Sequence, residues 1–278
     1  MGPRKKTARR IGLARALSKL GFCSRSQAAE LIRAGRVHLN EGVRFDPETP
    51  VHLTRDRILV DDRPIEPGDK IYLMMNKPRG LITTAADEKG RETVYSLLEK
   101  SGFATKGVDP LRSAPTPVNS ACRNPLWVAP VGRLDKASEG LLLLTSDSEW
   151  GARVAAPETH LQKTYHVQIA RVADETLLAA LTAGVNVDEK SRDGETMCAS
   201  QARLLRCGPK NCWLEIVLTE GKNRQIRRML QALGVEVLRL VRVAIGSLQL
   251  GNLAKGDYRP LTTDEKKMLD CAMHARTP

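Results

Sequence analysis

The sequence predicts a protein of the α+β class, in which a small N-terminal module precedes a larger domain that contains a sheet. Apolar residues recur at helical spacing twice within the first 35 residues, and short strand-like segments follow at 36–40 and 57–60. Alternating segments at 161–170 and 213–219 predict strands in the remaining two hundred residues. We therefore expect a basic tail at 1–9, the module at 10–68 and the larger domain at 69–273.

Composition limits the classes of protein to consider. The 278 residues are 41% hydrophobic and 27% charged, which allows a buried core and is not typical of a disordered chain. The longest apolar run, at 140–145, is far too short to cross a bilayer, so we expect no membrane span. Lysine and arginine outnumber acidic residues 44 to 32, and this balance favours a polyanionic partner such as nucleic acid.

The cysteines and the N-terminus bear on metal binding and location. None of the six cysteines forms a C-x-x-C pair, so no structural zinc site is predicted. Cysteines scattered in this way indicate reduced thiols and a cytoplasmic protein. The first 29 residues are basic and contain no acid, as in a mitochondrial transit peptide, but their apolar spacing favours a folded helix pair.

The N-terminal module begins with two predicted helices. The first covers 13–20 and ends before Gly21. The second follows Ser24, whose hydroxyl can form a capping box with Gln27, and it stops at Gly35.

Basic residues dominate these helices. Ten lysines and arginines and a single acid lie between Arg4 and Arg36. Four of them are candidates for phosphate contacts, namely Lys19, Arg25, Arg33 and Arg36. Charge alone leaves open the alternative of a solvated helix face.

The larger domain opens with a predicted strand at 70–75, which runs into the segment MNKPRG. Its proline and glycine end the strand, and Lys77 and Arg79 are either turn residues or candidates for RNA phosphate contacts. The segment 100–125 is rich in Gly, Pro, Ser and Thr and is expected to be a surface insertion or loop.

Asp135 is the candidate functional acid in GRLDKASEGLLLLT, residues 132–145. It lies on a predicted turn between two apolar strands, and two cations flank it. Gly132 and Gly140 permit a tight backbone that can present the carboxylate in a cleft, whereas an ordinary solvated turn aspartate is the alternative. Ser138 lacks the neighbours of a nucleophile elbow, so a serine hydrolase is not predicted.

The segment LQKTYHVQIA alternates as a strand does and places Lys163 and Tyr165 on one face. Tyr165 is either a core aromatic residue or a platform for stacking on a base. His166 faces the other way and is expected to be structural or exposed.

A basic amphipathic helix is predicted in LTEGKNRQIRRMLQALG, residues 218–234, with Asn223 as its cap. Arg224, Arg227 and Arg228 share the face beside its apolar stripe. The glycine spacing of a Walker loop is missing, so a nucleotide site of that kind is not predicted.

Taken together, these segments resemble the ribosomal pseudouridine synthases of the RsuA/RluB/RluF type. RIGLARALSKLGFCSRSQAAELIRAGRVHLN resembles their alpha-L RNA-binding module, and MNKPRG, GRLDKASEGLLLLT and EGKNRQIRRM follow in order. The resemblance implies a catalytic domain with a mixed, mainly antiparallel sheet flanked by helices. It departs at Ser148, where the pattern has glycine, and in the insertion.

The resemblance also implies roles for individual residues. Asp135 would be the catalytic aspartate, Tyr165 would pack against the target base, and Arg227 would pair with the carboxylate. Arg133 would assist flipping of the target nucleotide, and the other expected substrate contacts are Lys77, Lys163, Lys222, Arg224 and Arg228. No cofactor and no metal are implied.

The implied partner is ribosomal RNA or a ribosomal assembly intermediate, bound by a cytoplasmic monomer. Two alternatives are a tRNA-directed synthase and a non-catalytic ribosome-binding or assembly protein. The joint presence of Asp135, Tyr165 and Arg227 argues against the second, because binding alone needs no carboxylate toward an anionic ligand.

Overall fold

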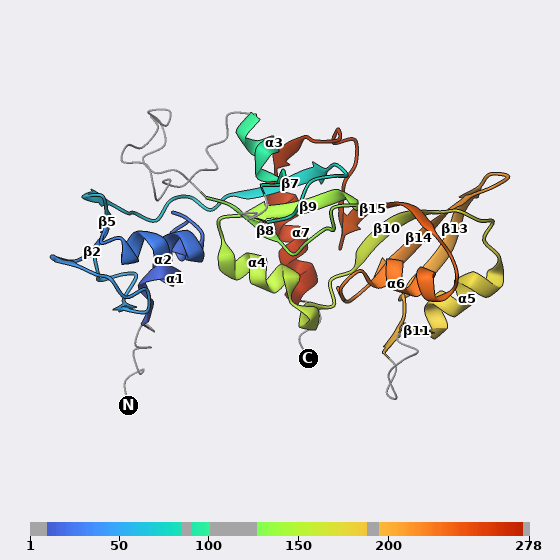
Figure 1. Ribbon diagram of the computed structural model, residues 1–278, viewed down its shortest axis with the longest axis horizontal. Coiled ribbons are helices and arrows are strands. Elements are labelled where there is room, and N and C mark those ends of the chain that lie inside the picture. The colour runs from blue at the N-terminus through green and yellow to red at the C-terminus, as the bar shows by residue number, and fades with distance from the viewer. Residues whose placement is uncertain (1–9, 85–89, 101–126, 188–194, 275–278) are drawn as a thin grey trace. The chain divides into compact units, whose positions relative to one another are not determined.

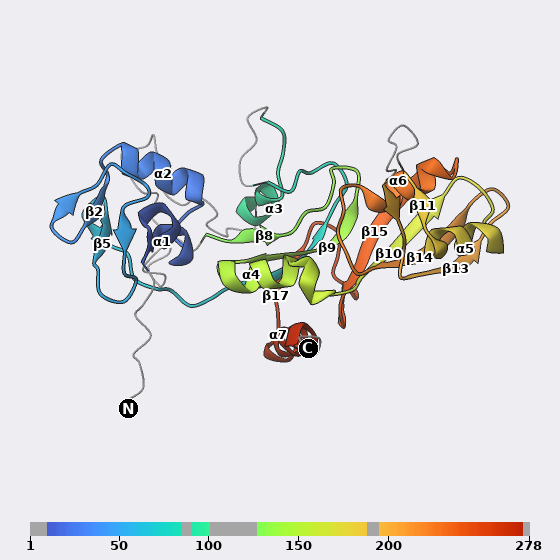
Figure 2. The same cartoon turned by 90° about the horizontal axis from the view of Figure 1, so that it is seen from below.

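The computed structural model describes residues 10–84, 90–100, 127–187 and 195–274, so the basic tail and nearly all of the expected insertion lie outside it. The predicted α+β class is confirmed (Figures 1 and 2). The described residues form two compact units. The first contains 10–72 with the short pieces 98–100, 127–129 and 145–148, and the second contains the rest.

The first unit contains two helices in its N-terminal part, as the apolar spacing predicts. They are α1 (Leu13–Lys19) and α2 (Arg25–Arg33). The capping box is present, because the amide of Gln27 donates to Ser24 Oγ at 3.2 Å and the amide of Ser24 donates to Gln27 Oε1 at 3.1 Å. Leu13, Leu17 and Leu31 are fully buried in the core that the two helices share with the strands.

Short strands complete this unit. A four-stranded sheet has the order β3 (Gly42–Val43), β2 (Val37–Leu39), β5 (Ile58–Val60) and β6 (Arg63–Pro64), and β1 (Ile11–Gly12) pairs with β4 (Pro50–Val51). The expected strands at 36–40 and 57–60 are therefore present but shorter. Asn40 ends β2 because it turns the chain in the left-handed conformation, with φ 58°.

Within the described ranges, the larger sheet has nine strands. Its main path runs in the order β13 (Gln201–Cys207), β14 (Cys212–Leu218), β10 (Lys163–Ile169), β15 (Val237–Ile245), β9 (Glu139–Thr145), β7 (Tyr72–Lys77) and β17 (Tyr258–Pro260), with β16 (Leu248–Gln249) on β15 and β8 (Ala129–Val131) on β9. β9 and β15 are parallel, whereas β10 pairs antiparallel with both β14 and β15. A separate ribbon joins β11 (Val185–Asn186) and β12 (Thr196–Met197).

Helices cover the sheet through apolar contacts. The described helices of this part are α3 (Tyr95–Lys100), α4 (Ser148–Ala155), α5 (Glu175–Ala183), α6 (Gln225–Ala232) and α7 (Thr263–His274), with a 3₁₀ turn at Pro157–Thr159. α5 and α6 lie beside the strands at the β13–β14–β10 end of the sheet (Figure 1). They bury Leu177, Leu181, Ile226 and Met229 in one core with residues of β10 and β14. In the described ranges, no helix combines the length and the hydropathy that a bilayer crossing requires.

The close approach of β9 and β15 depends on Gly140. Its Cα is paired in register with that of Arg242, and its φ of 102° is one that L residues rarely adopt. A β-carbon at this position would overlap the carbonyl oxygen of Arg242. Glycine is therefore required for close pairing of the parallel strands at this point.

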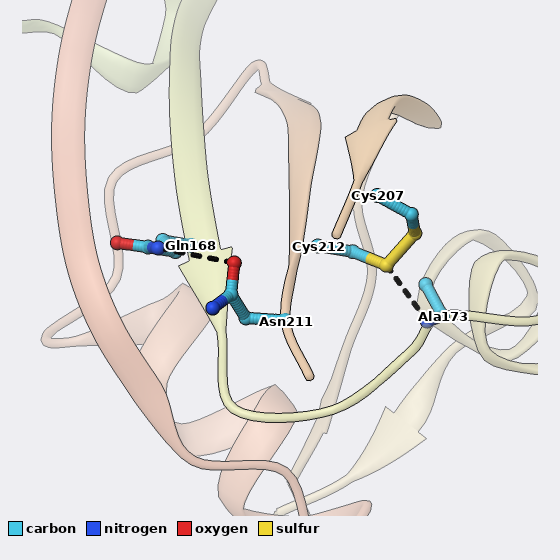
Figure 3. The surroundings of a disulfide bond; sticks show 5 residues. All are labelled: Gln168, Ala173, Cys207, Asn211 and Cys212. Carbon is cyan, nitrogen blue, oxygen red and sulfur yellow. Dashed lines mark hydrogen bonds between the residues drawn. A yellow bond between two sulfur atoms is a disulfide. The ribbon is translucent and has the colours of Figure 1, made fainter. Parts of the chain in front are cut away.

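One expectation from the cysteines is wrong in part. Cys207 and Cys212 form a disulfide across the β13–β14 turn, where they are cross-strand partners (Figure 3). Cys212 Sγ also accepts a hydrogen bond from the amide of Ala173 at 3.3 Å. Cys23, Cys198 and Cys271 carry free thiols, in keeping with the expectation. Sequence spacing missed the pair because a hairpin, not a short motif, brings it together.

Candidate active site

A cavity of about 390 Å³ lies in the second unit. Its walls come from segments far apart in the sequence, and they include Arg133, Asp135, Ser138, Lys163, Tyr165, Lys222, Arg224 and Arg242. The volume falls in the range of pockets that enclose small ligands. The structure thus brings Asp135 and Tyr165 together, as the sequence analysis expects.

The turn that carries Asp135 is held by hydrogen bonds from other segments to its backbone carbonyl groups. Gly132 opens it with φ 70°, and five consecutive carbonyl groups then each accept a hydrogen bond. The donors are Thr83 Oγ1 to Leu134 (2.8 Å), Lys77 Nζ to Asp135 (3.2 Å) and Ser138 (3.0 Å), the Gly80 amide to Lys136 (2.8 Å) and Arg227 Nη2 to Ala137 (3.1 Å). These bonds use none of the Asp135 carboxylate oxygens, so the half-buried side chain is presented to the cavity on a preorganised frame.

Lys77 has a different place from the one expected. Its side chain is fully buried and its ammonium donates to the carbonyls of Pro78, Asp135 and Ser138, so it does not contact phosphates. Burial lowers the pKa of Lys77 to about 8, against the opposing charges of Asp135 and Glu139. The expected phosphate ligand is therefore a structural cation beneath the turn. The surrounding apolar strand sequence was the available signal for its burial.

Arg227 also differs from its expected contact. Among the described residues, no ion pair joins Arg227 to Asp135, and Arg227 instead donates to the carbonyl of Ala137. Burial is the main factor that lowers the pKa of Arg227, and the charge of Asp135 opposes this effect. Arg227 thus supports the turn and acts on Asp135 through space.

Strands β10 and β15 also contribute to the wall of the cavity. Tyr165 is half-buried against the apolar core, and its Cα is paired with that of Arg242. Arg242 is only 5% exposed and donates from Nε to the carbonyl of Leu141 at 2.7 Å. Sequence reasoning missed Arg242. Its signal is an arginine inside the otherwise apolar stretch LVRVAI, where a buried cation needs a purpose.

Lys163 lies on the same strand as Tyr165 and lines the cavity. Burial lowers the pKa of Lys163, and the positive charge of Arg242 lowers it further. His166 is on the other side of β10, with Nε2 3.4 Å from Glu215 Oε2, as a structural histidine would be.

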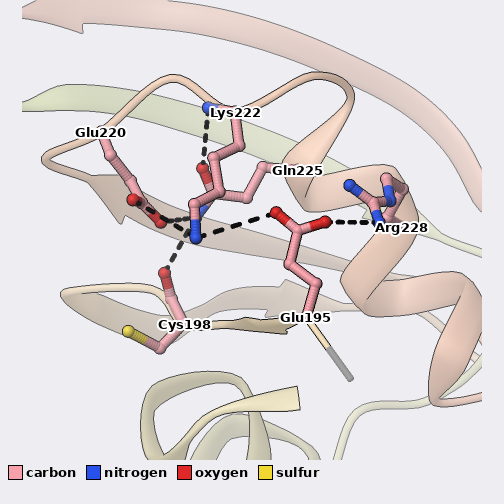
Figure 4. Close-up of polar contacts among 6 residues, drawn as sticks. All are labelled: Glu195, Cys198, Glu220, Lys222, Gln225 and Arg228. Carbon is pink, nitrogen blue, oxygen red and sulfur yellow. Dashed lines mark hydrogen bonds and ion pairs between the residues drawn. The ribbon is translucent and has the colours of Figure 1, made fainter. Parts of the chain in front are cut away.

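The start of α6 differs in detail from the expected cap. Arg224, not Asn223, occupies the cap position, with φ 49° and no capping bond from its side chain. A non-glycine residue in this conformation is strained, and such strain is common at functional sites. Arg224 is exposed and lines the cavity, whereas the side chain of Gln225 is buried and donates to Glu220 and to the carbonyl of Cys198 (Figure 4).

Two of the expected substrate contacts have protein partners. Arg228 Nη2 lies 2.8 Å from Glu195 Oε2, and Lys222 Nζ lies 3.9 Å from the other Glu195 oxygen and 3.7 Å from Glu220 (Figure 4). These pairs are partly exposed and therefore weak, so phosphate can compete for the cations. Arg133 is exposed at the cavity, like Arg224.

Glu139 is a second acid close to the turn, and sequence reasoning did not single it out. It is 4% exposed and accepts two bonds from Arg239, at 2.9 and 3.0 Å, and an ion pair from Lys255 at 2.6 Å. Burial raises the pKa of Glu139, but the bonds and charges of Arg239 and Lys255 outweigh it and hold the pKa below its usual range. It does not line the cavity, and it ties β9 to β15.

The candidate RNA contacts of the first unit fall into two groups. Arg25 and Arg33 are exposed on α2, and Lys19 is half-buried at the end of α1. Arg36 instead donates from Nε to Asp61 at 2.8 Å. Their contact with RNA stays a prediction.

Comparison with known proteins gives a consistent result. The profile of the RNA pseudouridylate synthase family matches residues 71–232, and that of the S4 domain matches residues 11–58. The ribosomal large subunit pseudouridine synthase B of Bacillus subtilis (strain 168) is 33% identical over 260 residues, which cover 92% of this chain and 94% of that protein. An RNA pseudouridine synthase of Rickettsia conorii is 34% identical over 250 residues, or 90% and 95% of the two chains. A crystal structure of a pseudouridylate synthase, 28% identical, superimposes with a TM-score of 0.58 and covers 93% and 99% of the two chains.

Proposed function

The chain belongs to the RNA pseudouridine synthase family, whose members are isomerases, and we propose that its substrate is a uridine of ribosomal RNA. The observation that carries the proposal is the presence of Asp135, on a turn with every carbonyl bonded from Leu134 to Ser138, in one cavity with Tyr165. The S4 domain and the ribosomal substrate named for the Bacillus relative support RNA of the ribosome as the target.

Asp135 is proposed as the nucleophile. Isomerisation breaks the bond between N1 of uracil and C1′ of ribose, turns the base, and joins C5 to C1′. The C5 proton is lost and N1 regains a proton, so no atom or electron is gained overall. A carboxylate can carry the reaction by adding either to C1′ or to C6 of the base. The reaction is redox-neutral and needs no second substrate, so we propose no cofactor.

Tyr165 and Arg227 are proposed to assist this carboxylate. A paired or stacked uridine must leave its helix before it reaches the cavity, at a cost of roughly a few kcal/mol. The ring of Tyr165 can stack on the flipped base, and its hydroxyl can take part in removal of the C5 proton. Arg227 holds the turn through Ala137, and its positive charge interacts with the negative charge of Asp135. Arg133, exposed at the cavity, is the candidate to occupy the space that the base leaves.

RNA capture is assigned to exposed cations. Arg25 and Arg33 in the first unit, and Arg224 at the cavity, are exposed and are proposed to contact backbone phosphates. We propose a cytoplasmic monomer that acts on ribosomal RNA, free or within an assembly intermediate.

The test is release of tritium from RNA that contains [5-³H]uridine, because only loss of the C5 proton frees the label. Ribosomal RNA fragments should release tritium and tRNA should not. Chemical mapping of pseudouridine in cells with and without the protein then identifies the site. Release of tritium from tRNA alone would show that the substrate is tRNA and not ribosomal RNA. Binding of RNA without release of tritium from any RNA would favour a non-catalytic assembly protein.

A further inference from the structure

The β10–β15 wall of the cavity holds two cations that the proposed mechanism does not use. Arg242 is 5% exposed, and its Nη2 is buried with no hydrogen-bond partner among the described residues. Lys163 stands on the neighbouring strand and lines the same cavity. In the described part of the chain, no carboxylate lies within ion-pair distance of either cation. A buried guanidinium nitrogen without an acceptor is costly, so an acceptor from outside the protein is expected there.

Depth separates this pair from the other cations of the cavity. Arg133 and Arg224 are exposed, whereas Arg242 is almost completely buried. The backbone phosphates of an RNA stay outside, because they continue into the neighbouring nucleotides. Only the flipped base enters far enough to meet a buried residue. The exposed arginines therefore suit phosphate, whereas buried Arg242, with half-buried Lys163 beside it, suits the base.

We propose that Arg242, with Lys163 beside it, binds the carbonyl oxygens of the flipped uracil and stabilises the negative charge that develops on the base. This inference rests on the proposed function and adds catalytic residues to it. Uracil presents two carbonyl oxygens, O2 and O4, as acceptors at its edge. A guanidinium has several donors in one plane, which suits a flat ring.

Either route for Asp135 places negative charge on one or both of these oxygens. If the carboxylate bonds to C1′, the electron pair of the broken C1′–N1 bond passes into uracil and spreads over N1, O2 and O4. If the carboxylate adds to C6, the electron pair of the C5–C6 double bond moves to C5 and O4. Preorganised cations at the site of developing charge are among the strongest contributions to catalysis in a water-poor cavity.

The fold holds Arg242 in place for this role. Its Nε is bonded to the carbonyl of Leu141 on β9, and its backbone is pressed against Gly140. Its Cα is also paired with that of Tyr165, so the proposed charge-binding group and the proposed stacking ring are neighbours across two strands. The positive charge of Arg242 contributes to the lowered pKa of Lys163, which shows that the two cations interact and would both gain from an anionic base.

The first experiment compares single-turnover tritium release by the wild type, Arg242→Gln and Arg242→Lys at saturating RNA. We expect Arg242→Gln to slow the chemical step about 100-fold, the order found when one oxyanion donor is removed. RNA affinity, measured in the Asp135→Asn background, should change little. Arg242→Lys keeps the charge and should lose less. Arg206→Gln removes an arginine from β13, which does not line the cavity, and should leave the rate unchanged.

The second experiment changes the acceptor on the RNA. Sulfur is a poor hydrogen-bond acceptor, so RNA with 2-thiouridine or 4-thiouridine at the target should react more slowly with the wild type. If Arg242 binds that oxygen, the same thio-substitution should cost Arg242→Gln and Arg242→Lys much less. Equal costs in wild type and variants for both substitutions would overturn the proposal. So would an unchanged rate in a folded Arg242→Gln.

These outcomes remain distinct from failure of the proposed function. If the wild type converts no uridine, the proposed function itself is wrong. If the wild type is active and loss of Arg242 weakens RNA binding with no effect on the chemical step, the residue is a phosphate ligand and this inference is wrong. Should Arg242→Gln not fold, the thio-substitution comparison with Arg242→Lys decides the question.

Discussion

Lys77 and Arg242 are both buried cations on the two strands that flank β9, yet they differ in their hydrogen bonds. Lys77 donates to three carbonyl groups, which accounts for all the protons of its ammonium. Arg242 satisfies Nε with Leu141, and its Nη2 has no partner within the described ranges. Burial alone therefore does not distinguish a structural cation from one that awaits a ligand. The distinction lies in whether the donors are already used.

The same comparison applies to the two acids nearby. Glu139 has its carboxylate held by Arg239 and Lys255, whereas no hydrogen bond or ion pair within the described residues occupies the carboxylate of Asp135. The acid with occupied oxygens builds the sheet, and the other faces the cavity. The following changes test this division.

Asp135→Asn should have the largest effect. We expect loss of pseudouridine formation by roughly 10⁴-fold or more, because the neutral amide is a poor nucleophile. RNA affinity and thermal unfolding should stay near those of the wild type, because the hydrogen bonds that hold the turn are accepted by its backbone carbonyls and not by the Asp135 side chain. Glu139→Gln is the matched control. It should lower the free energy of unfolding and leave the activity per folded molecule unchanged. Substantial activity in folded Asp135→Asn would show that the catalytic residue is misplaced.

Lys77→Met tests the cation whose donors are all bonded to carbonyls of the protein. It removes the ammonium bonds to three carbonyls, of which that of Asp135 keeps its bond from the Ser138 amide, and it should slow the reaction about 100-fold through a displaced Asp135. Stability should change with pH in a defined sense. The pKa of Lys77 is about 8 in the fold against 10.5 ordinarily, so the unfolded chain binds more protons between these values and the wild type gains stability as pH rises. The gain over Lys77→Met should reach about 3 kcal/mol at pH 10.5. A difference independent of pH in denaturant unfolding would contradict it.

Gly140→Ala tests the seam between β9 and β15. An alanine must adopt φ 102° and its β-carbon overlaps the Arg242 carbonyl, so the free energy of unfolding should fall by about 3 kcal/mol. Gly132→Ala is the control. It has φ 70° with nothing within 4 Å, and should cost only about 1 kcal/mol. Equal losses in urea unfolding would mean that the close approach is unimportant.

Tyr165→Phe separates stacking from chemistry. The ring remains, so RNA affinity should be unchanged. Loss of the hydroxyl should slow single-turnover tritium release by about 100-fold if it takes the C5 proton. A normal rate would leave Tyr165 with stacking only.

The smallest effect is expected in the first unit. Arg25→Gln combined with Arg33→Gln removes two exposed cations and should reduce the salt dependence of RNA binding by about two phosphate contacts. Arg36→Gln removes a cation already paired with Asp61 and should change the slope less. Equal slopes for the two proteins, from binding measured at several salt concentrations, would show that pairing does not decide which cations meet RNA.

The sequence predicts local features well. Apolar spacing and the capping residues locate α1 and α2, and alternation locates β10 and β14 to within about two residues. The glycines around Asp135 correctly indicate an unusual backbone, and Asp135 and Tyr165 do share a cavity. These features depend on residues close in the sequence, where spacing carries the information.

Contacts between distant segments could not be predicted in the same way. Lys77 looks like a phosphate ligand because two of its three carbonyl partners lie 58 and 61 residues further along the chain. The local pattern does not predict that Arg242 is buried, because its burial depends on the pairing of β15 with β9. The Cys207–Cys212 bond depends on the register of a hairpin. In each case a local pattern indicates the residue type, and only the fold gives its partners.

The position of β15 has a consequence for synthesis of the chain. This strand lies between β9 and β10 in the sheet but follows both in the sequence by roughly seventy residues or more. While the chain emerges from a ribosome, β9 and β10 each lack this partner, and their exposed edges can join only after residue 245 has been made. The strands of the N-terminal module pair with one another within residues 11–64, so this module can fold earlier. A chain interrupted before β15 would thus carry an assembled S4 module but would lack the strand that completes the cavity around Asp135.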